Sequence, residues 1–359
     1  MSGERRVGPV VRSRDVTFRV HDPDGALRSV MLRQELTRPR IGPHFTKPRA
    51  SDIWRLQVSR PPVDRMEYRL ELGYPHGGSE TVCDPGNPLV APGPFGHKSV
   101  VEFPEYRAPA WLAAPEPPVG TVTEHHVDSP AIGAGQPVTL WSAAGSRPDD
   151  RLPLLVANDG PEYARYSGLL AMLDRMVDAG RLPPMRAALL PPVDRNEHYS
   201  ASPAYAKALA RDVLPAVDDL APRPRHRSTR VGIGASLGAL SMLHVHRSRP
   251  TTFGALFLQS GSFFVPHHDG HESWMRRYDR VVRFVARMHA AEPGPDPVPV
   301  VMTCGTGEEN LANNRDMRGA LLSLGYDVAL HEVRDAHNWV AWRDAFDPHL
   351  VGLLGRMWS

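Results

Sequence analysis

Cysteine is nearly absent from this sequence of 359 residues, which contains only Cys83 and Cys304. A disulfide scaffold needs several close pairs and a zinc site needs a cluster of ligands, so the sequence indicates two buried, reduced thiols. Apolar runs of about 18 residues, the length that a membrane-spanning helix needs, are also absent. These absences exclude a disulfide-rich module and an integral membrane protein built from helices.

An excess of one charge is missing as well, because 42 Lys and Arg stand against 40 Asp and Glu. This balance gives no electrostatic reason to expect nucleic acid or a membrane as a partner. Residues 1–7 carry charge, but no apolar stretch typical of a secretory signal follows them. We therefore expect a cytoplasmic protein, and the sequence leaves open whether it forms a homo-oligomer.

The first third of the chain has the pattern of a β domain. Residues 15–20 alternate apolar and polar side chains, and a turn signal, Asp-Pro-Asp-Gly, follows at 22–25. Further short strands follow without an intervening helix, which predicts an antiparallel β-sandwich over residues 1–106. Residues 107–119 are rich in proline and alanine and are interpreted as a linker.

Residues 120–359 change character, because apolar strands now alternate with segments of helical periodicity. Residues 163–179 and 204–220 are each predicted to form one long helix. This alternation is typical of a mostly parallel sheet covered on both faces. The predicted fold class is therefore α/β, with a smaller β-sandwich preceding the larger domain.

A Gly-x-Ser-x-Gly motif occupies residues 234–238 of this larger domain. It follows a predicted strand at 229–233 and opens a predicted helix at 237–247, the setting of the nucleophile elbow in α/β-hydrolases. The crowded turn leaves no room for side chains at Gly234 and Gly238. The motif thus predicts an α/β-hydrolase fold with Ser236 as the nucleophile.

A serine hydroxyl needs a base, and the base needs an orienting acid. In this fold the acid and then the histidine follow the serine, on loops after late strands. His337 comes directly after the predicted strand at 328–333, and Glu308 follows the strand at 298–303. Glu309 is an alternative acid, whereas Asp335 is interpreted as a turn residue.

The reaction also requires hydrogen-bond donors for the developing oxyanion. The residue after the nucleophile, Leu237, is expected to supply one backbone N–H. The second is expected from the loop after the predicted strand at 152–158, from either Asp159 or Gly160.

The larger domain resembles the enterochelin-esterase-like branch of the α/β-hydrolases, a group that also holds feruloyl and mycolyl esterases. The resemblance rests on seven segments in the same order, at 156–160, 179–185, 194–199, 234–238, 258–264, 304–308 and 337–343. It implies a serine esterase with Ser236 as nucleophile, Glu308 as acid and His337 as base, without a cofactor or a metal. The first 105 residues resemble the early-set sandwich that precedes the catalytic domain in enterochelin esterases. Two positions depart from the pattern: Ala239 replaces a glycine, and the acid is Glu rather than Asp.

The resemblance also implies a substrate, a siderophore ester of the catecholate trilactone type, whose ferric form is strongly anionic. Arg195 and Arg165 are candidate cations for binding it, although surface ion pairs are an alternative role for both. Phe264 is a candidate for an acyl or aryl pocket, or else a core residue. The His-rich run at 267–271 is interpreted as a polar loop near the cleft rather than a metal site.

Two alternative functions remain open at this point. The chain could act as an esterase or acyltransferase on other acyl or aryl esters, such as feruloyl or trehalose acyl esters. It could also be a catalytically inactive binding or scaffold protein, although the retained serine, acid and histidine argue against this.

Overall fold

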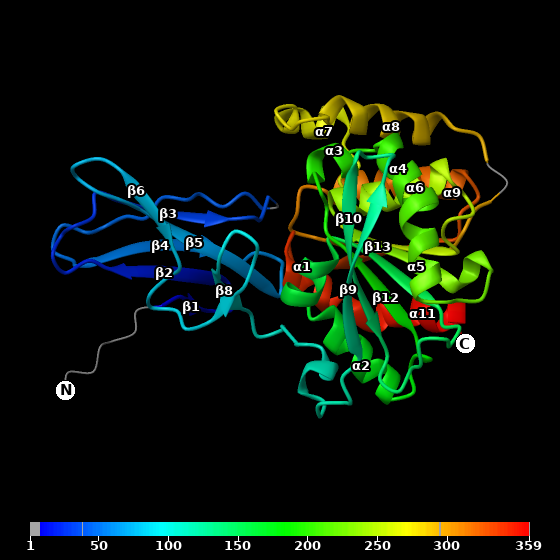
Figure 1. The fold of residues 1–359 in the computed structure, drawn as a ribbon. Helices are drawn as coiled ribbons and strands as arrows, with labels where there is room; N and C mark the ends of the chain where they lie inside the picture. The colour runs from blue at the N-terminus through cyan, green and yellow to red at the C-terminus, as the bar shows by residue number, and fades with distance from the viewer. Residues whose placement is uncertain (1–7, 38, 294–295, 359) are drawn as a thin grey trace. The chain divides into compact units, whose positions relative to one another are not determined.

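The computed structural model describes residues 8–37, 39–293 and 296–358, and the chain divides into two units (Figure 1). The first unit comprises the described residues of the amino-terminal part together with Gly305–Glu309 and Arg334–Asn338. The second unit holds the remaining residues.

The first unit contains two antiparallel sheets. One has the strand order β1-β2-β4; the other has the order β3-β5-β8-β7, with β6 also paired to β5. Alternate residues of each strand point inward, as Val16, Phe18 and Val20 do in β2, so the sheets share one apolar core. The strands are β1 Val10–Val11, β2 Asp15–His21, β3 Ser29–Gln34, β4 Ile53–Ser59, β5 Arg65–Gly73, β6 Ser79–Val82, β7 Val90–Ala91 and β8 Lys98–Glu102.

The second unit is built on an eight-stranded sheet with the order β16-β15-β14-β13-β11-β12-β10-β9. The pairs from β12 through β11, β13 and β14 to β15 are parallel, whereas β9 and β10 form an antiparallel edge. The strands are β9 Thr121–Ser129, β10 Ala134–Ser142, β11 Leu154–Asn158, β12 Arg186–Leu190, β13 Arg230–Ala235, β14 Ala255–Gln259, β15 Val300–Gly305 and β16 Val328–Val333.

Helices cover both faces of this sheet (Figure 1). Leu154 and Val156 of β11 pack into one apolar cluster with α4, α5, α6, α8 and α9. Leu155 and Ala157 of the same strand pack into a second cluster with α1, α2 and α11. The helices are α1 Gly160–Tyr166, α2 Leu169–Asp178, α3 Arg195–Tyr199, α4 Pro203–Ala208, α5 Leu214–Leu220, α6 Leu237–Ser248, α7 Pro266–Asp269, α8 Tyr278–Ala290, α9 Leu311–Ser323, α10 Trp339–Asp344 and α11 Val351–Trp358.

The predicted fold class is confirmed: an α/β-hydrolase-like unit follows a smaller antiparallel β unit. Two predicted helices are interrupted, however. The helix expected at 163–179 is divided into α1 and α2, because Gly168 adopts a positive φ of 61°. The helix expected at 204–220 widens into a π-helical turn at Leu209–Val213, just before Pro215, which has no N–H to donate.

No helix in the described part of the chain is both long enough and apolar enough to cross a membrane. The segment 1–7, for which the sequence predicts no secretory signal, lies outside the described residues.

Candidate active site

Ser236 lies in a strained turn between β13 and α6, in the second unit. Its φ of 56° and ψ of −125° are rare for a residue with a side chain. A Cβ at Gly234 would lie 2.5 Å from the carbonyl group of Gly238, so the turn can close only around glycine. The local sequence therefore forces Ser236 out of the strand and into a partly exposed position at the start of the helix.

The turn at Ser236 is held by the neighbouring strand. Its N–H donates to the carbonyl of Gln259 at the end of β14, at 2.9 Å, and its carbonyl accepts the N–H of Ser262 at 3.2 Å. The two hydroxyl oxygens of Ser236 and Ser262 lie 3.0 Å apart. The side chain of Ser236 is partly exposed. Because it precedes the twelve-residue helix α6, the hydroxyl lies at the positive end of that helix.

His337 and Glu308 form a tight pair in the first unit. Nδ1 of His337 lies 2.5 Å from Oε2 of Glu308. The Glu308 side chain is 1% exposed and that of His337 is 30% exposed, so the acid is buried behind a base that reaches solvent. Glu308 also accepts the N–H of Gly305 through its other oxygen. Burial lowers the pKa of His337, but the charge and hydrogen bond of Glu308 outweigh it, and the pKa is raised.

The structure distinguishes among the three carboxylates near this histidine. Glu308 bonds the imidazole, whereas Glu309 is exposed. Asp335 is buried, and its Oδ1 accepts the N–H of Ala336 at 2.7 Å and the amide of Asn338 at 2.9 Å. Asp335 thus has the turn geometry that the sequence analysis expected.

The loop after β11 presents the other backbone groups of interest. The N–H of Asp159 donates to the hydroxyl of Tyr199 at 3.1 Å, so this candidate oxyanion donor already has a partner. A Cβ at Gly160 would lie 2.4 Å from the Cα of Leu189, so this position accepts only glycine. Of the two donors expected from this loop, Gly160 is therefore the better candidate. Leu237 is the first residue of α6, where N–H groups have no partner within the helix.

Each of the three predicted substrate-binding residues contacts another side chain of the protein. The Arg195 guanidinium donates to both carboxylate oxygens of Asp159, at 3.0 and 2.9 Å, which neutralises its charge. Phe264 is only 6% exposed and stacks on Tyr278 in the core, with ring centroids 5.9 Å apart. These contacts do not test substrate binding, so a binding role for the two residues stays a prediction. Arg165 is exposed and lies over the ring of Tyr166.

Sequence reasoning missed Ser262 and Tyr199 as residues of the site. Both lie in segments that carried the resemblance, at 258–264 and 194–199, but a serine or tyrosine there has no distinctive spacing. Only the fold shows that Ser262 contacts the nucleophile candidate. The position of Ser262 after the carboxyl end of β14 was the one signal in the sequence that could have placed it at the site.

The His-rich run is more ordered than the sequence suggested. It forms the short helix α7, in which Asp269 is buried and accepts two hydrogen bonds from the Asn313 amide. His267, His268 and Asp316 each offer one ligand atom, all within 4.8 Å of one another, and all three are exposed. The chemistry of these three side chains would suit a metal ion.

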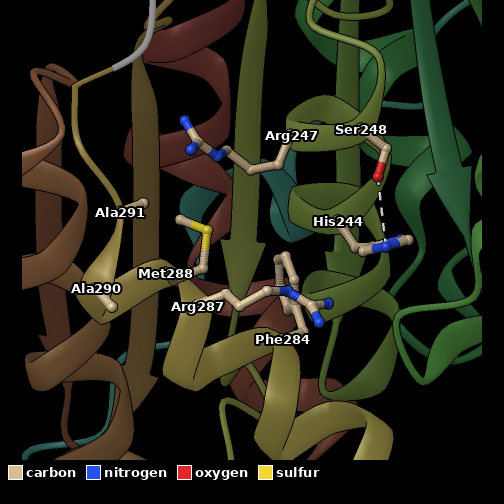
Figure 2. Close-up of a pocket in the computed structure, with 8 residues that line it drawn as sticks. All are labelled: His244, Arg247, Ser248, Phe284, Arg287, Met288, Ala290 and Ala291. Atoms are coloured by element: carbon tan, nitrogen blue, oxygen red, sulfur yellow. Dashed lines mark hydrogen bonds between the residues drawn. The ribbon is translucent and has the colours of Figure 1, made fainter.

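A separate hollow of about 450 Å³ opens between α6 and α8 (Figure 2). Its lining combines apolar side chains with two guanidinium groups and comprises His244, Arg247, Ser248, Phe284, Arg287, Met288, Ala290 and Ala291. His244 lies in the last turns of α6, whereas Ser236 precedes its first turn. The hollow therefore does not include the serine hydroxyl.

A family profile and curated relatives match this chain. Residues 138–353 match the profile of the family described as "Putative esterase". The iron(III) enterobactin esterase of Escherichia coli O6:H1 is 26% identical over 300 residues, which are 82% of this chain and 72% of that protein.

Solved structures extend the likeness in fold. The ferric enterobactin esterase of Salmonella typhimurium superposes with a TM-score of 0.79 at 20% identity, over 98% of this chain and 96% of its own. A ferulic acid esterase covers 67% of this chain and 99% of its own, with a TM-score of 0.56 at 17% identity. This ferulic acid esterase therefore has no counterpart for about a third of this chain.

Proposed function

The chain belongs to this esterase family, since the matching profile covers more than half of it, and we propose that it hydrolyses carboxylic esters through an acyl-enzyme on Ser236. The observation that carries the proposal is a strained serine turn at the start of a helix, in a chain that also holds a buried carboxylate bonded to a histidine. Ser236, His337 and Glu308 form the proposed triad.

The proposed reaction begins when Nε2 of His337 accepts the hydroxyl proton of Ser236. The serine oxygen attacks the ester carbonyl carbon, and the bond to the alcohol oxygen then breaks. The proton passes from the imidazolium to the departing alcohol. A water molecule then repeats the sequence on the acyl-enzyme and releases the acid and the free serine. Glu308 accepts the Nδ1–H throughout, which orients the ring and stabilises its charged form.

The negative oxygen that develops in each step needs preorganised donors. We assign this role to the backbone N–H groups of Leu237 and Gly160. The position of Leu237 at the helix start supports the first assignment. The second rests on the engaged N–H of Asp159 and on the tight packing of Gly160 against Leu189.

A siderophore ester of the catecholate trilactone type is the proposed substrate. The curated relatives that match this chain include iron(III) enterobactin esterases, and the fold likeness to such enzymes covers 98% of the chain. Arg165, exposed and resting on an aromatic ring, offers positive charge to an anionic ferric complex.

A serine-directed fluorophosphonate probe tests the nucleophile. We expect the wild-type chain to be labelled and Ser236→Ala to lose labelling, because the probe reacts only with an activated hydroxyl. Ser262→Ala is the matched control, since its hydroxyl lies 3.0 Å from that of Ser236. Labelling that survives in Ser236→Ala, or that is missing from the wild type, would contradict the proposal; the second outcome would favour a scaffold protein.

Hydrolysis of a substrate panel tests the ester class. Iron-free and ferric catecholate trilactones are compared with feruloyl, trehalose acyl and p-nitrophenyl esters, each against His337→Ala as the background. We expect the highest kcat/KM on a trilactone. A higher value on a feruloyl ester would replace the substrate assignment and leave the proposed triad intact.

A further inference from the structure

The segment that carries His337 is built into the amino-terminal β unit. The N–H of Asp64 donates to the carbonyl of Arg334 at 2.7 Å, and the Arg334 side chain returns a bond to the Asp64 carboxylate at 2.8 Å. Ala336, only 4% exposed, packs in the same apolar cluster as Phe18 and Phe103. The loop after β16 thus depends on residues from the beginning of the chain.

A buried arginine, Arg65, extends this attachment to Asn338, the residue after the histidine. Arg65 is 3% exposed and donates to Oε1 of Glu67 at 2.8 Å and to Oδ1 of Asn338 at 3.4 Å. The amide of Asn338 donates to Asp335 at 2.9 Å, and Asp335 also accepts the N–H of Ala336. Asp335 and Asn338 are 6% and 4% exposed. A buried charge is costly when it loses its partner, so these contacts restrain the loop.

The loop that carries Glu308 is held by the same unit. The carbonyl of Gly307 accepts the N–H of Thr37 at 2.9 Å, and the N–H of Gly307 donates to the carbonyl of Asp335 at 3.1 Å. A Cβ at Gly307 would lie 2.5 Å from Cδ2 of Leu36, so the loop lies directly on the β unit. The acid loop and the base loop are therefore bonded both to the β unit and to each other.

We propose that Arg65 is a positioning residue for the esterase reaction: through Asn338 and Asp335 it holds His337 in line with Glu308. This inference rests on the proposed function. A catalytic pair must keep its geometry to within about 0.5 Å, which requires a second layer of fixed contacts. The amino-terminal unit supplies that layer, so its role is catalytic support.

The test uses the full-length chain with Arg65→Met and with Arg65→Lys, which keeps the charge. We expect Arg65→Met to lower kcat at least tenfold with KM changed less than twofold, and Arg65→Lys to recover part of the loss. Lys47→Met is the matched control, because it removes another ion pair of the same unit, Lys47 to Asp22 at 2.8 Å. It should leave kcat within twofold of wild type.

A spectroscopic readout separates positioning from general stability. The proton between Nδ1 of His337 and Glu308 should give a far-downfield NMR resonance, assigned by its loss in His337→Gln. We expect Arg65→Met, if folded by circular dichroism, to weaken or shift this resonance, and Lys47→Met to preserve it. A folded Arg65→Met with an unchanged resonance and kcat within twofold of the control would overturn the proposal.

Asn338→Leu covers the case in which Arg65→Met does not fold. It keeps Arg65, Glu67 and Asp335 in place and removes only the amide between them, and the same changes in kcat and resonance are expected at smaller size. Unchanged values would again overturn the positioning role. If the wild type hydrolyses no ester, the proposed function fails, but the resonance still reports whether Arg65 orients the histidine.

Discussion

At the scale of single residues, two adjacent glutamates have very different surroundings. Glu308 is buried and bonds the imidazole of His337, whereas Glu309 faces solvent. We predict that Glu308→Gln lowers kcat by about 10²–10⁴-fold, the range typical of an acid–base partner, because a neutral amide cannot stabilise the imidazolium. Glu309→Gln should stay within threefold of wild type. Steady-state hydrolysis of a p-nitrophenyl ester measures both, and the reverse order would move the acid by one position.

The pH dependence of hydrolysis reports on the same pair. The base must be neutral to accept a proton, so kcat/KM should rise with pH through the pKa of His337. That pKa is raised by Glu308 against the opposing effect of burial, so the rising limb should lie above pH 6.5. Glu308→Gln removes the negative charge and should move the limb to lower pH. A limb that is identical in both proteins would contradict the pairing.

The sequence could predict these residues because the chemistry requires a local pattern. A serine between two glycines, after a strand and before a helix, is recognisable without coordinates, and the histidine follows the last predicted strand. The partners of Arg195 and Phe264 were not predictable. An arginine on a loop and a phenylalanine after a strand have the same pattern whether they meet a substrate, Asp159 or Tyr278.

At the scale of elements, the turn between β13 and α6 is the most sterically constrained. In Gly234→Ala the new methyl group would lie 2.5 Å from the Gly238 carbonyl, and backbone cannot move aside cheaply. We predict a loss of unfolding free energy of about 1–3 kcal/mol, the usual cost of overpacking, together with loss of probe labelling. Chemical denaturation measures the first effect.

The matched control is Gly319→Ala in α9. No atom beyond the helix's own backbone and the adjacent residues lies within 4 Å of the added methyl group, and alanine favours a helix over glycine by about 1 kcal/mol. This variant should unfold at equal or higher denaturant. Equal destabilisation of the two variants would refute the steric account of the turn.

Strands were easier to predict than helix continuity. The strands of the large sheet are apolar runs bounded by turn-forming residues. Because both faces of the sheet are buried, nearly every position in these strands must be apolar, and the runs are easy to recognise. The interruption at Gly168 depends on its positive φ, and the one before Pro215 depends on the N–H that proline lacks. Apolar periodicity does not detect either feature, since the buried positions continue across both breaks.

At the scale of the whole molecule, buried neutral histidines couple folding to pH. Burial, with nearby arginines, lowers the pKa of His244 and of His246 to about 4. The unfolded chain takes up a proton at each near pH 6.5, so their contribution to stability is complete above that value and is lost as pH falls toward 4. The fall in pH from 6.5 toward 4 therefore lowers the free energy of unfolding by on the order of 3 kcal/mol for each histidine.

Thermal unfolding as a function of pH checks this coupling. The Tm should decline between pH 6.5 and 4, and His244→Gln should flatten part of that decline. His226→Gln, at an exposed position, is the control and should leave the slope unchanged. An identical slope in all three proteins would show that these histidines do not set the acid sensitivity.

The attachment of the two loops to the amino-terminal unit was beyond prediction from sequence. Arg65 has the ordinary appearance of a strand residue, and its partner Asn338 is 273 positions away. No periodicity or motif connects such positions. The grouping of these loops with the amino-terminal unit follows from tertiary contacts alone.

The long distance along the chain between Arg65 and Asn338 affects how the protein folds during its synthesis. The β strands are translated before residues 305–309 and 334–338, which complete their core and the contacts of Arg65. At roughly 5–20 residues per second, the nascent β unit waits for tens of seconds with an incomplete interior. During this interval Ala336 is missing from its apolar core, and Asn338 is missing from the contacts of Arg65.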